Sequence, residues 1–237
     1  MRSCLIQLLV TIAVIFAVLW FGLPFGASWI ATNALNAAGF TGTNTRVDVQ
    51  ADLPPRILLG HADRIRLTST QVSVGDLHAA SIDMTLGNVE LIDRKIGTIH
   101  GSMTGVRVPA ATGGNPLTAD SVTVDGSGSS ATATLTCTSA EMKTLVVSQL
   151  KAKKINATAV TFSAPDKVTV TASGVTKTGR LVVSNGSLEV VVAGLSPSTT
   201  TVINAGNGNP IRFTSVAVTA TSVTLVGTID LQTLLGL

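Results

Sequence analysis

Few residues in this sequence have the types and spacing that catalysis or metal binding requires. His61 and Asp63 stand two residues apart in an alternating segment, so their side chains would point to the same side of a strand. His78 and His100 have no second histidine, cysteine or carboxylate at metal-ligand spacing on a helix. We therefore interpret His61 and Asp63 as parts of a polar turn, and we predict no metal site.

Motifs for nucleophilic or phosphate chemistry are also missing. The sequence has no Gly-x-Ser-x-Gly nucleophile elbow and no Gly-rich loop ending in Lys-Ser or Lys-Thr. Gly206-Asn-Gly208-Asn lacks the flanking strand and helix of a phosphate loop, and its composition is typical of a turn. We predict that the protein is not an enzyme and needs no cofactor. An enzyme without a recognisable motif stays open as an alternative function, third after the two described at the end of this section.

Composition excludes one further class of function. Only 3% of the 237 residues are aromatic and none is tyrosine. Modules that stack nucleic-acid bases need exposed rings, so we predict no nucleic-acid partner. The formal net charge of +3 would suit an anionic membrane surface, but it is equally common on soluble proteins. Cys137 has no Cys-x-x-Cys partner, and we interpret it as a small buried apolar side chain.

The N-terminus contains the longest apolar run of the chain. Residues 5–25 carry no charge, and about 20 apolar residues in a helix match the hydrocarbon core of a bilayer. Arg2 precedes the run and Arg46 is the first charged residue after it, which predicts an exported C-terminal part. We expect residues 1–26 to be a membrane anchor or signal sequence and residues 27–237 an extracytoplasmic domain. The protein would be single-pass in the cell membrane, or secreted if the run is cleaved at the small residues that follow it.

After an Ala-rich helix predicted over residues 27–39, the hydrophobic period changes to two. This alternation predicts strands, with a break at Leu53-Pro54-Pro55 and a short apolar turn or helical stub over 56–60. Ser184-Asn185-Gly186 predicts a hairpin turn, and Ser196-Pro197 predicts a short helix that ends near Gly206. The predicted strands cover residues 64–70, 71–74, 80–89, 99–108, 121–125, 131–136, 157–163, 167–172, 178–183, 188–193, 211–220 and 222–228.

One amphipathic helix separates two blocks of predicted strands. Thr138 and Glu141 form a capping box, in which a hydroxyl and a carboxylate three residues on satisfy the first turn. Behind the box, one face of the helix is predicted to be buried, and it comprises Met142, Leu145, Val146, Gln149 and Leu150. The fold class that follows is α+β, with a long, highly twisted antiparallel sheet that wraps this helix and leaves an apolar groove.

The order of these features resembles the LmeA-like family of bacterial phospholipid-binding cell-envelope proteins. The resemblance rests on Val47-x-Val49, the proline break, Ile57-Leu58-Leu59-Gly60 leading to Asp63-Arg64-Ile65-Arg66-Leu67, and the helix opened by Thr138. It also includes the closing stretch Pro210-Ile-Arg-Phe-Thr-Ser-Val-Ala-Val and covers residues 27–237. Family members more often carry an aromatic Phe-Pro segment before the apolar turn, where this sequence has Leu53-Pro54-Pro55. The resemblance implies a fold related to tubular lipid-binding domains, with a lipid-sized groove.

The leading functional hypothesis is a non-enzymatic, membrane-anchored protein that binds phospholipid and supports envelope lipid handling or assembly. Its partners would be membrane phospholipid and the bilayer around the N-terminal helix. The predicted lipid contacts are Ile57, Leu58, Leu59, Met142, Leu145, Val146 and Leu150, and the predicted head-group or membrane-surface contacts are Arg56, Lys151, Lys153 and Lys154. The three lysines are equally explained as a solvated helix end. The second alternative is a structural or interaction protein of the cell surface with a filled β-rich core.

Overall fold

The computed structural model describes residues 40–74, 77–90, 92–93, 95–108, 110–111, 115–205 and 211–230. The predicted anchor (1–26) and Ala-rich helix (27–39) lie outside these ranges. Within them, no helix has the length and apolar character needed to cross a membrane. The elements in chain order are β1 (Phe40–Gln50), the 3-10 helix η2 (Pro54–Leu59), β2 (His61–Val74), β3 (Leu77–Glu90), β4 (Lys95–Val108), β5 (Leu117–Ser127), β6 (Ser130–Thr138), α3 (Ser139–Ala152), β7 (Ala157–Ser163), β8 (Lys167–Ala172), β9 (Val175–Ser184), β10 (Ser187–Val192), β11 (Thr199–Ile203), β12 (Ile211–Val218) and β13 (Ser222–Asp230).

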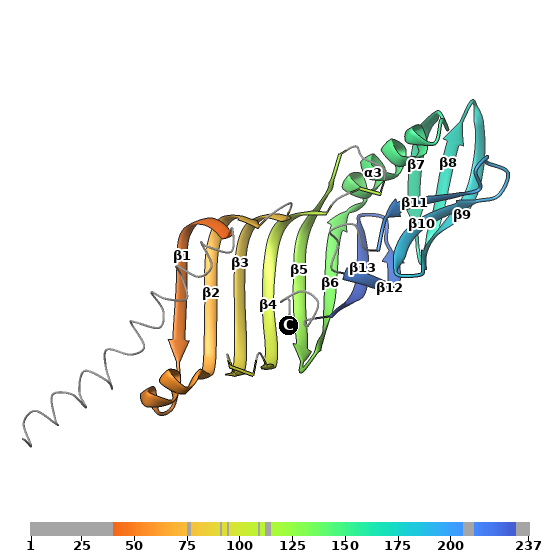
Figure 1. Ribbon diagram of the computed structural model, residues 1–237. Helices are drawn as coiled ribbons and strands as arrows, with labels where there is room; N and C mark the ends of the chain where they lie inside the picture. The colour runs from red at the N-terminus through yellow and green to blue at the C-terminus, as the bar shows by residue number, and fades with distance from the viewer. Residues whose placement is uncertain are drawn as a thin grey trace, which may run out of the picture.

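A broad antiparallel sheet of eight strands forms most of the molecule, in the order β1-β2-β3-β4-β5-β6-β13-β12 (Figure 1). Strict alternation of apolar with Thr or Ser residues produces its long strands, because successive side chains point to opposite faces. In β6, for example, Ala131, Ala133, Leu135 and Cys137 are buried in alternation with more accessible serine and threonines. One face of the sheet is therefore apolar and the other is rich in hydroxyl groups.

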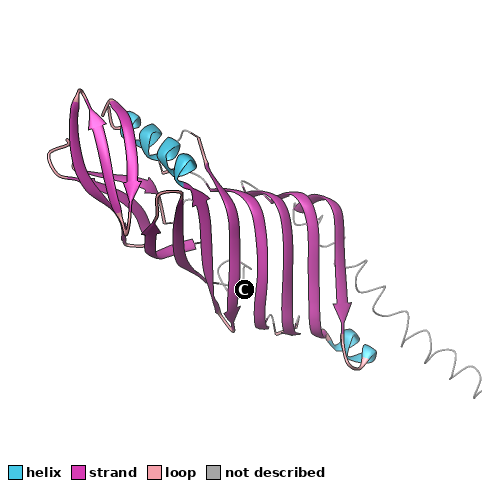
Figure 2. Ribbon diagram, turned by 180° about the vertical axis from the view of Figure 1, so that it is seen from behind, coloured by secondary structure: helices cyan, strands magenta, loops and turns pink. Residues whose placement is uncertain are grey.

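A second antiparallel sheet of five strands, in the order β11-β10-β9-β8-β7, lies at the other end of the elongated molecule (Figures 1 and 2). The predicted hairpin between β9 and β10 is confirmed, because Ser184 pairs with Ser187 around a two-residue turn. Asn185 and Gly186 have φ angles of 50° and 79°, the left-handed backbone that such a turn requires.

The last two strands return to the first sheet. β13 pairs with β6 from Ser222 opposite Thr138 to Asp230 opposite Ser130, and β12 then forms the sheet edge. The second sheet is thus inserted between β6 and β13 in the sequence. The sequence predicted both final strands, but it did not predict which sheet they join.

The helix prediction is confirmed in its cap and in its buried face. The backbone N–H of Glu141 donates to Thr138 Oγ1 at 3.1 Å, and all five predicted core residues of α3 are buried. The position of the helix differs from the expectation. α3 packs against β7 and β11 of the second sheet and against the ends of β5, β6 and β13, so it fills the junction of the two sheets instead of lying along the broad sheet (Figure 2).

The short helix predicted from Ser196 to Gly206 is wrong, because residues Thr199–Ile203 form β11 and pair with β10. Three threonines, a valine and an isoleucine in succession are all β-branched, and such side chains favour a strand. This preference and the open edge of β10 outweigh the N-terminal helix signal of Ser196-Pro197.

Candidate lipid-binding face

The apolar face of the broad sheet is continuous across its strands. One row of direct cross-strand neighbours runs from Ile82 in β3 through Met103 in β4 and Val122 in β5 to Leu135 in β6 and Leu225 in β13. A second row, two residues along each strand from the first, runs from Met84 in β3 through Gly101 in β4 and Val124 in β5 to Ala133 in β6. Because directly opposite residues of an antiparallel pair share a face, these rows form one apolar surface.

Solvent exposure along this row changes between β4 and β5. Val122, Leu135 and Leu225 are each at most 1% exposed, whereas Ile82 and Met103, in the same row, are only half-buried. In β2–β4 six large apolar side chains on this face are half-buried, and we call them the open face: Ile65, Leu67, Ile82, Met84, Leu86 and Met103. Among the described elements, the main contacts of β2–β4 are with neighbouring strands and with η2.

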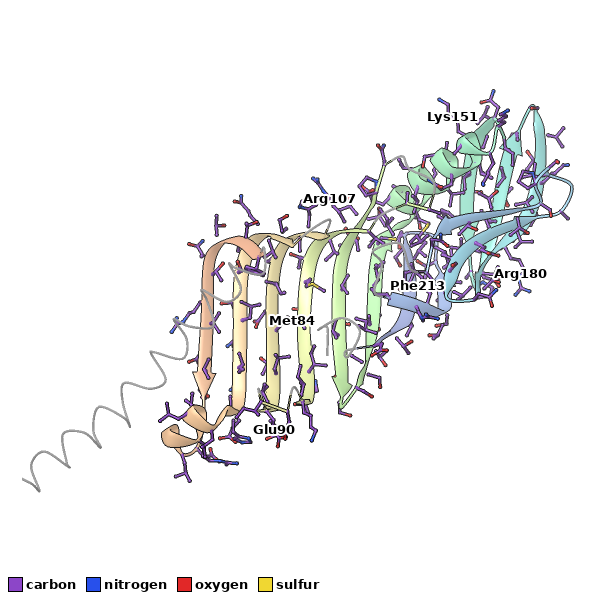
Figure 3. All side chains as sticks on the ribbon, viewed as in Figure 1. Met84, Glu90, Arg107, Lys151, Arg180 and Phe213 are labelled. Carbon is purple, nitrogen blue, oxygen red and sulfur yellow. The ribbon has the colours of Figure 1, made fainter. Side chains whose placement is uncertain are left out.

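The centre of the open face has an adaptable surface. Met84 lies opposite Gly101 of β4, and a methyl group added at Gly101 would overlap Met84 Sδ. The thioether therefore lies across the glycine, in the middle of the broad sheet (Figure 3). Methionine is unbranched and polarizable, so Met84 and Met103 can adjust to an irregular apolar ligand.

The opposite face of the same strands is polar. Arg66 Nε and Nη2 donate to the two carboxylate oxygens of Asp83 at 3.0 and 2.7 Å. This hydrogen-bonded pair lowers the pKa of Asp83 and raises that of Arg66. The Ser81 and Thr104 hydroxyl oxygens lie 2.7 Å apart on the same face. An apolar ligand would thus find only one side of β2–β4 suitable.

One end of the open face continues into η2. Ile57 of η2 is half-buried and packs against a small cluster formed by Val47, Val49, Ala62 and Val89. Ile65, Leu67 and Leu86 of the open face contact the same cluster. The next two residues of η2 point outward, since Leu58 is 63% and Leu59 is 72% exposed. Ile57 is therefore an apolar link between η2 and the open face.

Asp63 holds η2 onto the start of β2. Asp63 Oδ2 accepts the backbone N–H of Asp52, which precedes η2, and Oδ1 lies 2.9 Å from His61 Nε2 and 3.9 Å from Arg56 Nη1. The hydrogen bond from Asp52 and then the one from His61 lower the pKa of the Asp63 carboxyl. The alternation correctly predicted that His61 and Asp63 point to the same side, but the polar turn is wrong, because both residues lie in β2, where their contacts help to fix η2.

The four predicted lipid contacts in α3 are packed against protein. Met142, Leu145, Val146 and Leu150 are each at most 1% exposed and belong to the main hydrophobic core. Their contact with lipid stays a prediction. Cys137 also lies in this core, where burial raises the pKa of its thiol to about 12, so its interpretation as a small apolar side chain is confirmed.

The four predicted head-group residues do not share one site. Arg56 lies in η2, beside a hollow of about 320 Å³ that Glu90 also lines. Lys151 lies on α3, at the other end of the molecule from Glu90 (Figure 3). Lys153 and Lys154 immediately follow α3. A head-group role for Arg56 and one for the lysines are therefore separate predictions.

Sequence reasoning did not select the open face. Ile82, Met84 and Leu86 alternate with Ser81, Asp83 and Thr85, which predicted a strand with one buried face. The alternation is the same in strands whose apolar residues are fully buried, so periodicity alone could not show which strands remain accessible. The only compositional signal was the pair of methionines in neighbouring strands.

Comparison with known proteins agrees with this architecture. The model of the LmeA-like phospholipid-binding family matches residues 25–228, which is most of the chain. No significant match was found among curated proteins or among solved structures. The matched range spans both sheets, α3, η2 and the whole open face. By sequence and by the extent of that match, the chain belongs to the LmeA-like phospholipid-binding family.

Proposed function

We propose that the protein is a non-enzymatic carrier or holder of phospholipid in the cell envelope, and that the acyl chains lie on the open face. Residues 1–26 would anchor it in the membrane with the described domain on the extracytoplasmic side. The observation that carries the proposal is the change from buried to half-buried side chains along one continuous apolar row. Family membership supports a phospholipid as the ligand.

The chemistry of the open face suits acyl chains. Its six side chains are aliphatic or thioether groups, and binding would remove their apolar area from water at roughly 25 cal/mol per Å². Such a lining distinguishes chain lengths poorly, since each methylene contributes only about 0.8 kcal/mol. We therefore expect a mixture of acyl chains in the bound lipid, and head-group preference would come from polar residues at the margin.

The competing hypothesis is a cell-surface scaffold with a filled core. The half with β5, β6 and β13 fits that hypothesis, because its apolar face is closed. The open face does not, since a scaffold gains nothing from leaving six large apolar side chains in adjacent strands only half-buried. Mass spectrometry of a lipid extract from the purified protein separates the two hypotheses, because a scaffold would carry no stoichiometric phospholipid.

Two neighbouring residues of β3 offer a sharper test. Met84 points to the open face and Thr85 to the polar face, and both are half-buried. Met84→Gln keeps the side-chain length but places an amide against the acyl chains, so we expect bound phospholipid to fall at least about tenfold, which corresponds to about 1.4 kcal/mol. Thr85→Gln is the matched control and should keep the parent's lipid content. Equal lipid content in both variants would remove the open face as the site.

Membrane topology needs its own experiment. A reporter enzyme that works only after export, fused after Leu237, should be active in cells if the N-terminal run directs export. Activity of a reporter that requires the cytoplasm would contradict the proposed location while leaving phospholipid binding by the domain intact.

A further inference from the structure

Exposed apolar side chains are concentrated at one end of the broad sheet. Five large aliphatic side chains of the described residues are more than half exposed, and four of them lie on η2, on the residue just before it, or on the turn between β3 and β4. We call these four the tip: Leu53, Leu58, Leu59 and Ile92, which are 53%, 63%, 72% and 75% exposed. The fifth, Val175, begins β9 in the second sheet.

The two segments of the tip contact each other. A methyl group added at Gly60, which ends η2, would lie 2.8 Å from Ile92 Cγ1, so the β3–β4 turn packs closely against the end of η2. Leu59 and Ile92 also line the same shallow hollow. Both segments lie at the end of the sheet to which β1 and β3 run (Figure 1). The tip is therefore one surface.

We propose that the tip inserts into the lipid bilayer and is the place where phospholipid passes between the membrane and the open face. This inference rests on the proposed function. It adds the contact with the membrane, which phospholipid binding alone does not require.

The form of the tip favours a bilayer over a protein partner. A stable protein interface needs about 800 Å² from each partner, far more than four side chains on two short turns provide. A bilayer, in contrast, accepts single aliphatic side chains that project from a polar surface. Ile57 joins the tip to the cluster that the open face also contacts, so an acyl chain would meet apolar groups along the whole path.

The charges around the tip predict which lipid head groups favour its insertion. In the sequence, the segments that carry the tip contain four acidic residues, Asp52, Asp63, Glu90 and Asp93, and three basic ones, Arg56, Arg94 and Lys95, so their formal charges nearly cancel. This balance offers no attraction to an anionic surface. The hollow beside Leu59 and Ile92 is lined by both acidic and basic side chains, which can contact the two opposite charges of a zwitterionic head group. We therefore expect insertion into phosphatidylcholine vesicles with little dependence on salt.

Fluorescence quenching by brominated acyl chains tests insertion in the full-length chain. In a Cys4→Ser background, Leu59→Cys carries an environment-sensitive fluorophore, and Val175→Cys carries the same group as the matched exposed aliphatic position. Cys137 is buried and its thiol pKa is raised, so it should remain unlabelled. With the chain reconstituted in brominated phosphatidylcholine vesicles, we expect strong quenching at position 59 and none at 175. Absence of quenching at 59, or equal quenching at both positions, would overturn the inference.

A second arm measures lipid uptake. The Leu58→Ser, Leu59→Ser double variant should acquire isotope-labelled phosphatidylcholine from vesicles at least tenfold more slowly than the parent, but should reach the parent's occupancy when lipid is supplied in mixed micelles. Val175→Ser should behave as the parent does. Uptake from vesicles at the parent's rate by the double variant would overturn the role of the tip. A parent that acquires lipid from neither source would instead contradict the proposed function, and the quenching arm would still decide on the tip.

Discussion

In β5, β6 and β13 the inward apolar side chains are at most 6% exposed, whereas the six open-face side chains of β2–β4, on the same face of the sheet, are only half-buried. The two halves of the sheet have the same strand pairing and the same alternation of apolar and hydroxyl residues. They differ in their surroundings: α3 contacts β5, β6 and β13, and the second sheet contacts β12. The helix and the second sheet thus close one half of the apolar face.

On the proposed function, this difference separates stability from phospholipid binding within one sheet. The closed half supplies a core that holds the strands in register, and the open half can present apolar area because it relies on that core. Variants that disturb the closed half should lower stability, and variants of the open half should mainly change lipid content. The following predictions test this division, beginning with the largest effect.

Leu145→Asp should prevent stable folding. Leu145 is 1% exposed in the core between α3 and the sheets, so an aspartate there would be a buried charge without a partner. We expect a loss of at least about 4 kcal/mol in the free energy of unfolding, measured by thermal or urea denaturation followed by circular dichroism. Lys143→Asp on the exposed side of α3 is the control. A Leu145→Asp variant with the parent's midpoint would mean that the closed half is not a core.

Truncation of a leucine should have different effects in the two halves. Leu135→Ala removes a fully buried side chain of β6 and should lower the free energy of unfolding by about 2–5 kcal/mol. Leu67→Ala removes a half-buried side chain of β2 and should cost only about 1 kcal/mol, while it lowers bound phospholipid more than Leu135→Ala does. Equal stability losses would show that the open face is as closed as the rest.

Acid should loosen the attachment of η2. The interactions of Asp63 favour its carboxylate, so they contribute fully above the pKa of about 3.9 that aspartate has in an unfolded chain. They are lost as the pH falls through the lower pKa that Asp63 has in the folded protein. Hydrogen exchange at the Asp52 amide should therefore become less protected below about pH 4. Asp63→Asn should show weak protection at every pH. Protection that persists at pH 2 would mean that Asp63 does not hold this end of the sheet.

The smallest effect should come from the lysines at the end of α3. Replacing Lys151, Lys153 and Lys154 with Gln should change the quenching at position 59 by less than about twofold on phosphatidylcholine or anionic vesicles. Lys151 lies at the other end of the molecule from Glu90, which lines the same hollow as Leu59 (Figure 3), and salt screens exposed charges over such a separation. The sequence-based hypothesis predicts the opposite result on anionic vesicles. A salt-sensitive loss of more than tenfold would place membrane contact at the α3 end.

Much of the fold could be predicted because the signals were local. The alternation of Thr132, Thr134 and Thr136 with apolar residues specified β6, and Thr138 with Glu141 specified the start of α3. The sequence predicted β2 as two strands, 64–70 and 71–74, which meet at Gln71. In the structure Gln71 has a φ of 52° at an irregularity within one 14-residue strand. A local bulge preserves the strand although it shifts the alternation.

The site could be predicted only in part, because accessibility is a tertiary property. Ile57, Leu58 and Leu59 were selected as lipid contacts from their apolar run, and the structure places two of them at the surface. Leu145 and Met84 are both apolar residues in well-patterned elements, and only the packing of α3 and the second sheet shows that one is buried and the other accessible. The pairing of β13 with β6 could not be predicted from the sequence either, because 83 residues lie between the paired residues Thr138 and Ser222.

That return also determines how the chain can fold as it is made. Strands β1–β6 pair with neighbours in sequence and can form while the chain is still being synthesised. β6 can pair along its second side only after β13 has been made. Until then, the unpaired N–H and C=O groups of β6 form a sheet edge of high β propensity. Another copy of the chain could pair with this edge during that interval. The insertion of α3 and the second sheet between β6 and β13 therefore leaves the folding chain with an unpaired strand edge until Ser222–Asp230 have been made and have paired with β6.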